Sequence, residues 1–235
     1  MTENPYFVKL KNSKYKRGLI HIEGNDRKIF LQGLITNDIE KLTPDKPLYA
    51  CLLNAQGKFL HDFFVIEGDE FILLDCEGGE RAQDLYKRLN MYRLRADVQI
   101  SVEEHNDVYA IFESEEGLPD PRHKDMGRRA FEKPDYPEKP FETWDHKRIS
   151  LTIPDGSRDL IVEKSTMDEA SMDQLNAIDY DKGCYIGQEL TARMHYRGLG
   201  KRVLKTVNLD DTPDSAKLRS SCDDIGIALV KSKNV

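Results

Sequence analysis

The most unusual stretch of the sequence is Asp181-Lys182-Gly183-Cys184-Tyr185-Ile186-Gly187-Gln188-Glu189-Leu190-Thr191-Ala192-Arg193. Two glycines frame a Cys-Tyr pair, and residues 189–193 have a helix-forming composition. A thiol just before a helix lies near free backbone N–H groups at the positive end of the helix dipole, and Lys182 and Arg193 add positive charge. These features favour the thiolate, the reactive form of cysteine. The residues alone are equally compatible with a reactive Cys184 and with a small side chain that fills a gap in a glycine-rich turn.

The same stretch begins a basic segment. Residues 181–205 contain six lysines and arginines and two acidic residues, whereas the whole chain has a formal net charge of −7. A basic segment in an acidic protein indicates an anionic ligand or partner, and a solvated loop is the plain alternative. The overall acidity does not favour a nucleic-acid-binding protein. An RNA- or protein-binding module that uses this basic patch remains an open alternative.

Asp62 is the second informative position, because it lies within a predicted strand whose two faces are both apolar. Strand alternation predicts one face with Leu60, Asp62, Phe64 and Ile66, and an opposite face with Phe59, His61, Phe63 and Val65. A buried carboxylate must find hydrogen-bond donors or shift its pKa upward, so Asp62 is a candidate for a functional site. An aspartate near a strand end, bonded to a neighbouring amide, is the alternative. For His61 we expect an ordinary hydrogen-bonded histidine.

The chain of 235 residues mixes predicted strands and helices without a βαβ rhythm, so the expected fold class is α+β. Expected strands cover residues 18–23, 48–53, 58–67, 70–76, 97–104, 108–112, 201–209 and 224–231. The first expected helix begins at Asn25 or Asp26 and ends near 36–38. Further helices are expected over 81–91 and 144–151 and from residue 189. The predicted organisation is an N-terminal lobe (1–113), a linker rich in proline and charge (114–141), a second lobe (142–206) and a C-terminal β segment (207–235).

Several classes of protein are excluded or disfavoured by what the sequence lacks. No apolar run approaches the roughly 20 residues that cross a bilayer, so no membrane partner is expected. The first twenty residues lack the apolar core of a signal peptide, which favours a reducing compartment with free thiols. Cys51 and Cys76 lie in apolar runs and are expected to be buried. No Cys/His cluster has zinc-ligand spacing, so no metal site is expected.

Several motifs in order resemble one known family. Lys182-Gly183-Cys184-Tyr185-Ile186-Gly187-Gln188-Glu189 is similar to the signature KGCYxGQE of the YgfZ/Iba57 family. Phe30-Leu31-Gln32-Gly33-Leu34-Ile35-Thr36-Asn37-Asp38 resembles the N-terminal FLQGxxTND segment of that family. The segments 57–62, 92–95 and 153–156 also fall in family order, so the resemblance runs from about residue 18 to about residue 206.

The resemblance implies a fold like that of the glycine cleavage T-protein, a tetrahydrofolate-dependent aminomethyltransferase, with a central folate-binding cavity and a shortened C-terminal β domain. It implies a role in assembling or repairing iron–sulfur clusters, notably [4Fe–4S] centres, with iron–sulfur proteins or their assembly factors as partners. The T-protein motif lacks the Cys-Tyr pair, so Cys184 and Tyr185 favour the cluster-related branch. An active folate-dependent aminomethyl or one-carbon transferase is the alternative. A bacterial cytoplasmic location is the expectation.

The resemblance also implies roles for single residues. Asp62 occupies the acidic strand position that resembles the folate-facing aspartate of the T-protein. His61 stands where the T-protein pattern has a second acid, which weakens the transferase alternative. The residues that match the signature and the arginine after it are Lys182, Cys184, Tyr185, Gln188, Glu189 and Arg197. Of these, Cys184 is the expected reactive centre, as an iron ligand or in a transient mixed disulfide. The others, with Asp62, are the expected tetrahydrofolate-binding residues.

Overall fold

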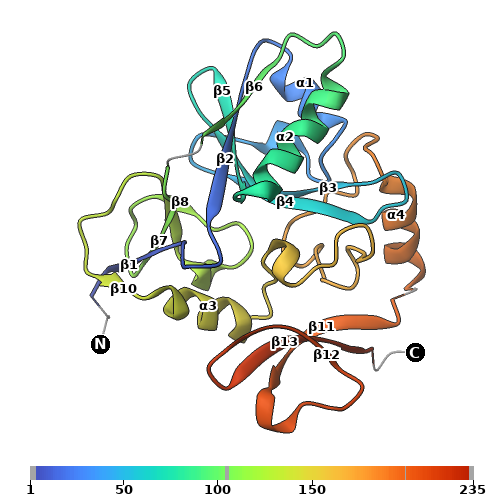
Figure 1. Cartoon of the computed structure of the whole chain (residues 1–235). Coiled ribbons are helices and arrows are strands. Elements are labelled where there is room, and N and C mark those ends of the chain that lie inside the picture. The colour runs from blue at the N-terminus through green and yellow to red at the C-terminus, as the bar shows by residue number, and fades with distance from the viewer. Residues whose placement is uncertain (1–3, 104–105, 199, 233–235) are drawn as a thin grey trace.

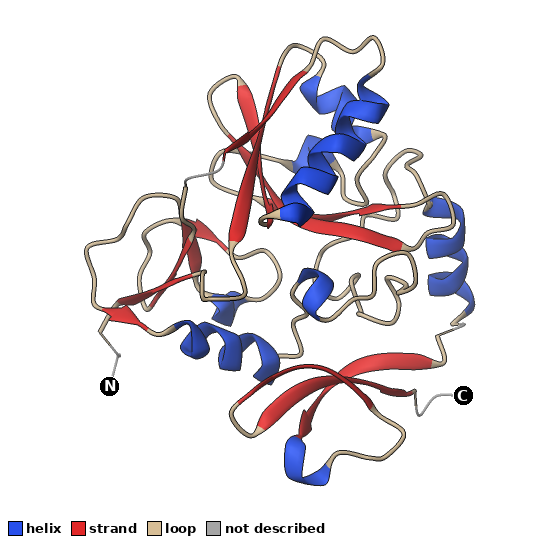
Figure 2. Cartoon of the chain, in the orientation of Figure 1, coloured by secondary structure: helices blue, strands red, loops and turns tan. Residues whose placement is uncertain are grey.

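Three β-sheets surround a central region of irregular chain (Figures 1 and 2). The structure is a computed structural model that describes residues 4–103, 106–198 and 200–232. Residues 151–187, which cross the region between the sheets, contain turns and the short 3-10 helix η3 (Gly156–Arg158). The expected α+β class is confirmed by this mixture of sheets and few helices.

The first sheet has the strand order β3-β4-β5-β2-β6, with antiparallel neighbours throughout. Its strands are β2 (Arg17–Glu23), β3 (Leu48–Leu53), β4 (Phe59–Glu67), β5 (Phe71–Glu77) and β6 (Gln99–Glu103). All five were expected, although the strand predicted over 97–104 also included Glu104, which lies outside the described residues. The helices α1 (Arg27–Gln32) and α2 (Glu80–Arg93) pack on one face, and α1 is shorter than expected because it ends at Gly33. The 3-10 helix η1 (Ile39–Lys41) follows α1.

The second sheet has the order β10-β1-β7-β9-β8 and corrects one expectation. Its strands are β1 (Tyr6–Lys9), β7 (Tyr109–Phe112), β8 (Leu118–Pro119), β9 (Arg128–Ala130) and β10 (Glu138–Lys139). Residues 114–141, expected as a linker, supply β8, β9, β10 and the 3-10 helix η2 (Lys124–Met126). These strands have two or three residues each. β10 pairs with β1, β9 pairs with β7 and β8 pairs with β9, so their structure depends on their pairing partners.

The third sheet has the order β11-β13-β12 and lies at the lower edge of Figure 1. Its strands are β11 (Arg202–Asn208), β12 (Lys217–Cys222) and β13 (Ile225–Lys231), with the 3-10 helix η4 (Leu209–Asp211) between the first two. The sequence predicted β11 and β13 and missed β12. Helix α3 (Phe141–Ser150) contacts this sheet, and α4 (Gln188–Arg197) precedes β11.

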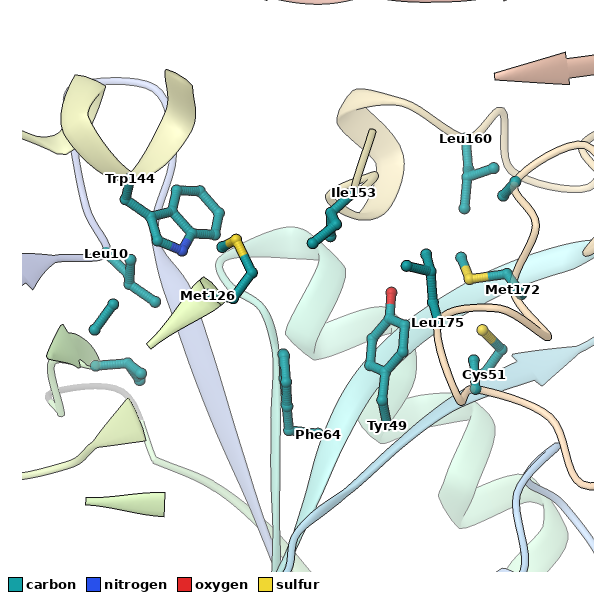
Figure 3. Packing of buried hydrophobic residues seen from close by; sticks show 14 of the residues in the cluster. Leu10, Tyr49, Cys51, Phe64, Met126, Trp144, Ile153, Leu160, Met172 and Leu175 are labelled. Carbon is teal, nitrogen blue, oxygen red and sulfur yellow. The ribbon is translucent and has the colours of Figure 1, made fainter. Parts of the chain in front are cut away.

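Two large apolar clusters hold the sheets together. One packs α1 and α2 against the first sheet and includes Leu31, Phe63 and Leu85. The other joins the opposite face of that sheet to the second sheet, α3, the irregular chain and the third sheet. Figure 3 shows Tyr49 and Phe64 in this central cluster, with Met126 and Trp144 on one side and Met172 and Leu175 on the other. β3 and β4 are therefore buried on both faces of the first sheet, and one of these faces packs against the central cluster.

Candidate functional site

Asp62 lies in β4 and faces the central cluster. Its side chain is 4% exposed, and its Oδ2 accepts a hydrogen bond of 2.6 Å from the Tyr49 hydroxyl on the neighbouring strand. Burial raises the pKa of Asp62, while the Tyr49 hydrogen bond and Arg17 oppose the rise. Gly156 approaches the same carboxylate, because a Cβ added there would lie 3.2 Å from Asp62 Oδ1. Asp62 is therefore a buried carboxylate, as its position in the sequence predicted, and the structure places it beside the 154–156 turn.

A β-bulge changes part of the face assignment in β4. The pairing with β3 shifts register between Leu52 and Leu53, so that Leu52 pairs with His61 and Leu53 with Phe59. As a result Phe59 packs in the central cluster and Leu60 packs on the side of α1 and α2. The predicted faces were wrong for these two residues because an inserted residue reverses the alternation before it.

His61 faces away from Asp62, towards α2. Its Nε2 lies 2.8 Å from Asp84 Oδ2, and burial, with Arg81 nearby, lowers the pKa of His61 to about 3. A neutral imidazole therefore donates to Asp84 at physiological pH. The expectation of an ordinary hydrogen-bonded histidine is confirmed. The side chain at the position where the T-protein pattern has a second acid therefore points away from the central cluster that Asp62 faces.

A network of buried charges surrounds Phe64, and the sequence analysis missed it. The guanidinium carbons of Arg129, Arg122 and Arg17 lie 3.6, 4.7 and 5.8 Å from the Phe64 ring centroid. Asp75 receives hydrogen bonds from Arg17 at 2.5 Å and from Arg129 at 2.6 Å. These residues are far apart in sequence, so no local pattern could have revealed the network.

The same network reaches the surroundings of Asp62 through the turn at 154–156. The Tyr15 hydroxyl donates to Asp155 Oδ1 at 3.1 Å, and Arg17 lies 3.6 Å from the same oxygen. Although burial raises the pKa of Asp155, the arginines around it, led by Arg148 and Arg158, hold that pKa below its ordinary value. The pKa values of the two buried carboxylates are therefore shifted in opposite directions. Arginines lower the pKa of Asp155, whereas Asp62 has fewer cationic neighbours and its pKa is raised.

The two long motifs of the sequence are in direct contact. Thr36 donates its hydroxyl to the carbonyl oxygen of Ala177 at 2.6 Å and accepts from the Cys51 amide at 2.8 Å. Asn37 donates to the carbonyl oxygens of both Tyr49 and Asn176, each at 2.8 Å. The 36–38 segment therefore joins β3 to the chain that leads into the signature.

Lys182 of the signature contacts the N-terminal motif directly, through three hydrogen bonds. Its Nζ donates to the carbonyl oxygens of Gln32, Ile35 and Asn37 at 2.8, 2.7 and 2.6 Å. Burial lowers the pKa of Lys182 to about 8, and the three carbonyl oxygens face an ammonium that is still largely protonated at neutral pH. Because its three hydrogens are directed at backbone oxygens, Lys182 fixes the signature to the end of α1. A direct contact from Lys182 to a folate stays a prediction.

Cys184 and the start of α4 are positioned by two glycines. A Cβ at Gly187 would lie 2.6 Å from the Asn54 carbonyl oxygen, and one at Gly57 would lie 2.9 Å from the Gly187 carbonyl oxygen. Both glycines have positive φ values, +83° and +65°. The turn between β3 and β4 thus packs directly on the N-cap of α4. Cys184, three residues before that cap, is the exposed one among the four cysteines, and the expected burial of Cys51 and Cys76 is confirmed.

The other signature residues divide between the interior and the surface. Tyr185 is buried, its ring centroid lies 5.3 Å from Lys182 Nζ, and burial raises the pKa of its hydroxyl. Gln188 and Glu189 form the first turn of α4, and Arg197 ends the helix on the exposed side. Among the described residues no hydrogen bond or ion pair joins Gln188, Glu189 or Arg197 to Asp62. Their role in binding folate stays a prediction.

A cavity of about 590 Å³ reaches Tyr49, the hydrogen-bond partner of Asp62, and Asp62 itself is not among the lining residues. It is lined by Asn37, Lys41, Lys46, Pro47, Leu48, Tyr49, Pro119, Pro121, Asn176, Ile178, Asp179, Tyr180 and Asp181. Tyr49 belongs both to this wall and, through its hydroxyl, to the Asp62 contact. Lys41 pairs with Asp179 at the wall. The cavity combines two tyrosines and apolar side chains with two lysines and two aspartates. Such a wall suits a flat ligand, and Lys46 can meet an anionic group of that ligand.

No family model matches the chain, but known proteins do. The chain is 30% identical to "Iron-sulfur cluster assembly factor IBA57 homolog, mitochondrial" of Coccidioides immitis, over 87% of this chain and 58% of that protein. It is 32% identical to the protein of that name from Neurospora crassa, over 81% of this chain and 52% of the relative. It is 28% identical to human "Iron-sulfur cluster assembly factor IBA57, mitochondrial", over 93% and 76%. The expected resemblance to the YgfZ/Iba57 family is confirmed. It spans little more than half the length of the fungal relatives.

A comparison of structures identifies the fold. The crystal structure of glycine cleavage system aminomethyltransferase T from Bartonella henselae matches 97% of this chain and 78% of its own, with a TM-score of 0.69 and 13% identity. The expected T-protein-like fold is therefore confirmed.

The expected bacterial cytoplasmic location is wrong. The YgfZ/Iba57 relatives that match the chain are named as mitochondrial proteins. Among the described residues no helix has the length and apolarity needed to span a membrane. The same residues contain no group of three or more His, Cys, Asp or Glu side chains arranged to hold a metal ion.

Proposed function

We propose that this chain supports the assembly of iron–sulfur proteins in mitochondria and that Cys184 is its reactive centre. The relatives that it matches are named iron–sulfur cluster assembly factors. The observation that carries the proposal is the exposure of Cys184 at a rigidly positioned site, whereas Cys51, Cys76 and Cys222 are buried. An exposed thiolate can ligate iron or form a mixed disulfide with a partner protein, and a buried thiol cannot reach one.

The rigidity of the site supports this role. Lys182 holds one side of Cys184 to the end of α1, and Gly187 packs the other side against the β3–β4 turn. A thiol between two such anchors is presented to a partner with little loss of conformational entropy, because its backbone is already ordered.

The test is the activity of a [4Fe–4S] enzyme in cells that lack their own protein of this family and express this chain. We expect the Cys184→Ser variant to give no recovery of activity and the Cys222→Ser variant to restore it, at equal protein levels. Full recovery with Cys184→Ser would refute the role of this thiol. Cys222 is a suitable control because its sulfur lies 3.6 Å from the Glu142 carbonyl oxygen, a contact that a serine hydroxyl can replace.

We further propose that the cavity that reaches Tyr49 binds tetrahydrofolate. Lys46 would hold a carboxylate of the glutamate tail, and the Asp62–Tyr49 pair would open toward the cavity to accept the N–H groups of the pterin, since Asp62 does not line it in this structure. Lys46 lines the cavity and is exposed, and among the described residues no acidic group pairs with it. Bound tetrahydrofolate would supply one-carbon carrier chemistry. The buried Asp62 contributes a hydrogen-bond acceptor in a site from which water is largely excluded.

The transferase alternative gains no support from His61. A second acid at this position would be expected near the reacting groups, but the His61 side chain is directed at Asp84 of α2. Binding of tetrahydrofolate without turnover is therefore the expected behaviour of this chain.

A further inference from the structure

The C-terminal end of α2 presents five consecutive exposed side chains, Met91-Tyr92-Arg93-Leu94-Arg95. We call these residues the α2 tip. The exposed fractions of Leu94, Met91 and Tyr92 are 88%, 74% and 40%. Figure 1 shows the end of α2 at the upper edge of the molecule, opposite the third sheet. The contacts that position the Cys184 segment involve no residue of the α2 tip.

Packing does not explain the conformation of the α2 tip. Leu94 has a φ of +44°, in the left-handed region that a side chain with a Cβ adopts only at an energetic cost. A leucine that is almost fully exposed gains no burial in return for this strain. Both costs are typical of residues that are retained for a contact outside the chain.

The charge of the α2 tip indicates what this contact is. Residues 87–97 contain four basic residues and one acidic residue, in a protein whose net charge is −7. Arg88 is bound to Asp84, but Lys87, Arg93 and Arg95 have no ion pair among the described residues. The acidic residue, Asp97, accepts a hydrogen bond from Asn25 at 2.8 Å. Free cations therefore alternate with exposed apolar side chains.

We propose that the α2 tip binds the surface of an anionic lipid membrane. Leu94 and Met91 would enter the boundary between headgroups and acyl chains, Tyr92 would lie at the headgroup level, and Arg93 and Arg95 would pair with lipid phosphates. A projecting apolar end flanked by cations fits a deformable anionic surface, and the cations gain no electrostatic attraction from a neutral one. The proposal is independent of the proposed function, since neither Cys184 nor Asp62 lies in the α2 tip.

Flotation of the purified chain with lipid vesicles tests the proposal. The vesicles contain phosphatidylcholine alone, or phosphatidylcholine with cardiolipin or phosphatidylglycerol. We expect binding to both anionic preparations and little to phosphatidylcholine, with affinity that falls as salt is raised. The Leu94→Gly variant removes the inserted side chain and also relieves the strained φ. We expect it to bind roughly tenfold more weakly while its melting temperature stays equal or rises.

Two further variants complete the test. Arg93→Gln with Arg95→Gln should weaken binding roughly 25-fold, at about fivefold for each cation. Leu218→Gly, which removes a leucine 49% exposed on β12, should leave binding unchanged. The absence of binding to anionic vesicles at low salt would overturn the proposal, as would equal binding by Leu94→Gly. Self-association that Leu94→Gly abolishes, without vesicle binding, would instead assign the α2 tip to contact between copies of the chain and would equally overturn it.

Discussion

Replacing Lys182 by methionine removes the ammonium that fixes the signature segment to the end of α1. The three hydrogen bonds from Nζ to the carbonyl oxygens of Gln32, Ile35 and Asn37 measure 2.6 to 2.8 Å. Methionine keeps the length and the apolar contacts of the side chain, so the hydrogen bonds are what is lost, at about 1.5–3 kcal/mol each before the cost of burying the charge is subtracted. We expect the free energy of unfolding to fall by about 2–3 kcal/mol, because three carbonyl oxygens lose their donor while the unfavourable burial of the ammonium is relieved.

Lys41→Met is the matched control for this variant. Lys41 pairs with Asp179 in the same region, but its side chain is 59% exposed, so the loss of stability should be much smaller than for Lys182→Met. Urea unfolding of the wild type and both variants, followed by circular dichroism, gives the three free energies. A Lys182→Met variant within about 1 kcal/mol of the wild type, or no less stable than Lys41→Met, would refute the anchoring role of Lys182.

Three other predictions concern the pH dependence of stability, the backbone near Cys184 and the accessibility of the thiols. The pKa of His61 is about 3 in the folded chain against an ordinary 6.5, so acidification protonates the unfolded chain first. Stability should therefore fall by about 2 kcal/mol between pH 7 and pH 5, as measured by urea unfolding, and His61→Asn should abolish this share of the slope. Gly187→Ala should cost at least about 2 kcal/mol, because φ is positive and the new Cβ meets the Asn54 carbonyl oxygen, while Gly183→Ala, with open space around it, should change stability by less than about 0.5 kcal/mol. Equal melting temperatures for these two variants would contradict the packing described for α4. Iodoacetamide should label Cys184 first in the native chain, as followed by mass spectrometry, and equally fast labelling of the buried Cys51 or Cys76 would contradict the assignment.

The strands and helices with regular patterns could be predicted from the sequence. The β3–β5 meander is apolar along each strand and is interrupted by turn residues such as Gly57 and Gly68, and α2 has apolar residues at helical spacing. Residues 114–141 could not be predicted, because β8, β9 and β10 are too short to show a period and are ordered by pairing with β9, β7 and β1 respectively. The bulge at the start of β4 was missed for a related reason, since register depends on the partner strand.

The candidate site was predictable only in part. Cys184 could be selected from its local sequence, because the glycines around it and the helix-forming residues after it are neighbours in the chain. The anchoring contacts of Lys182 could not, because its three acceptors lie about 150 residues earlier in the chain. The Tyr49 contact of Asp62 depends on strand pairing, and the arginines around Phe64 come from β2 and from the stretch that had been expected to be a linker.

Binding of tetrahydrofolate, followed by anaerobic titration of the purified chain, tests most directly whether the centre of the molecule is a ligand site. Asp62→Asn and His61→Asn place the same new residue on opposite faces of β4, and asparagine at 62 can still accept the Tyr49 hydrogen bond. We predict saturable binding by the wild type, a loss of tenfold or more with Asp62→Asn, and a change within about twofold with His61→Asn. No binding by the wild type, or an equal effect of both variants, would contradict the proposal of a folate site at Asp62.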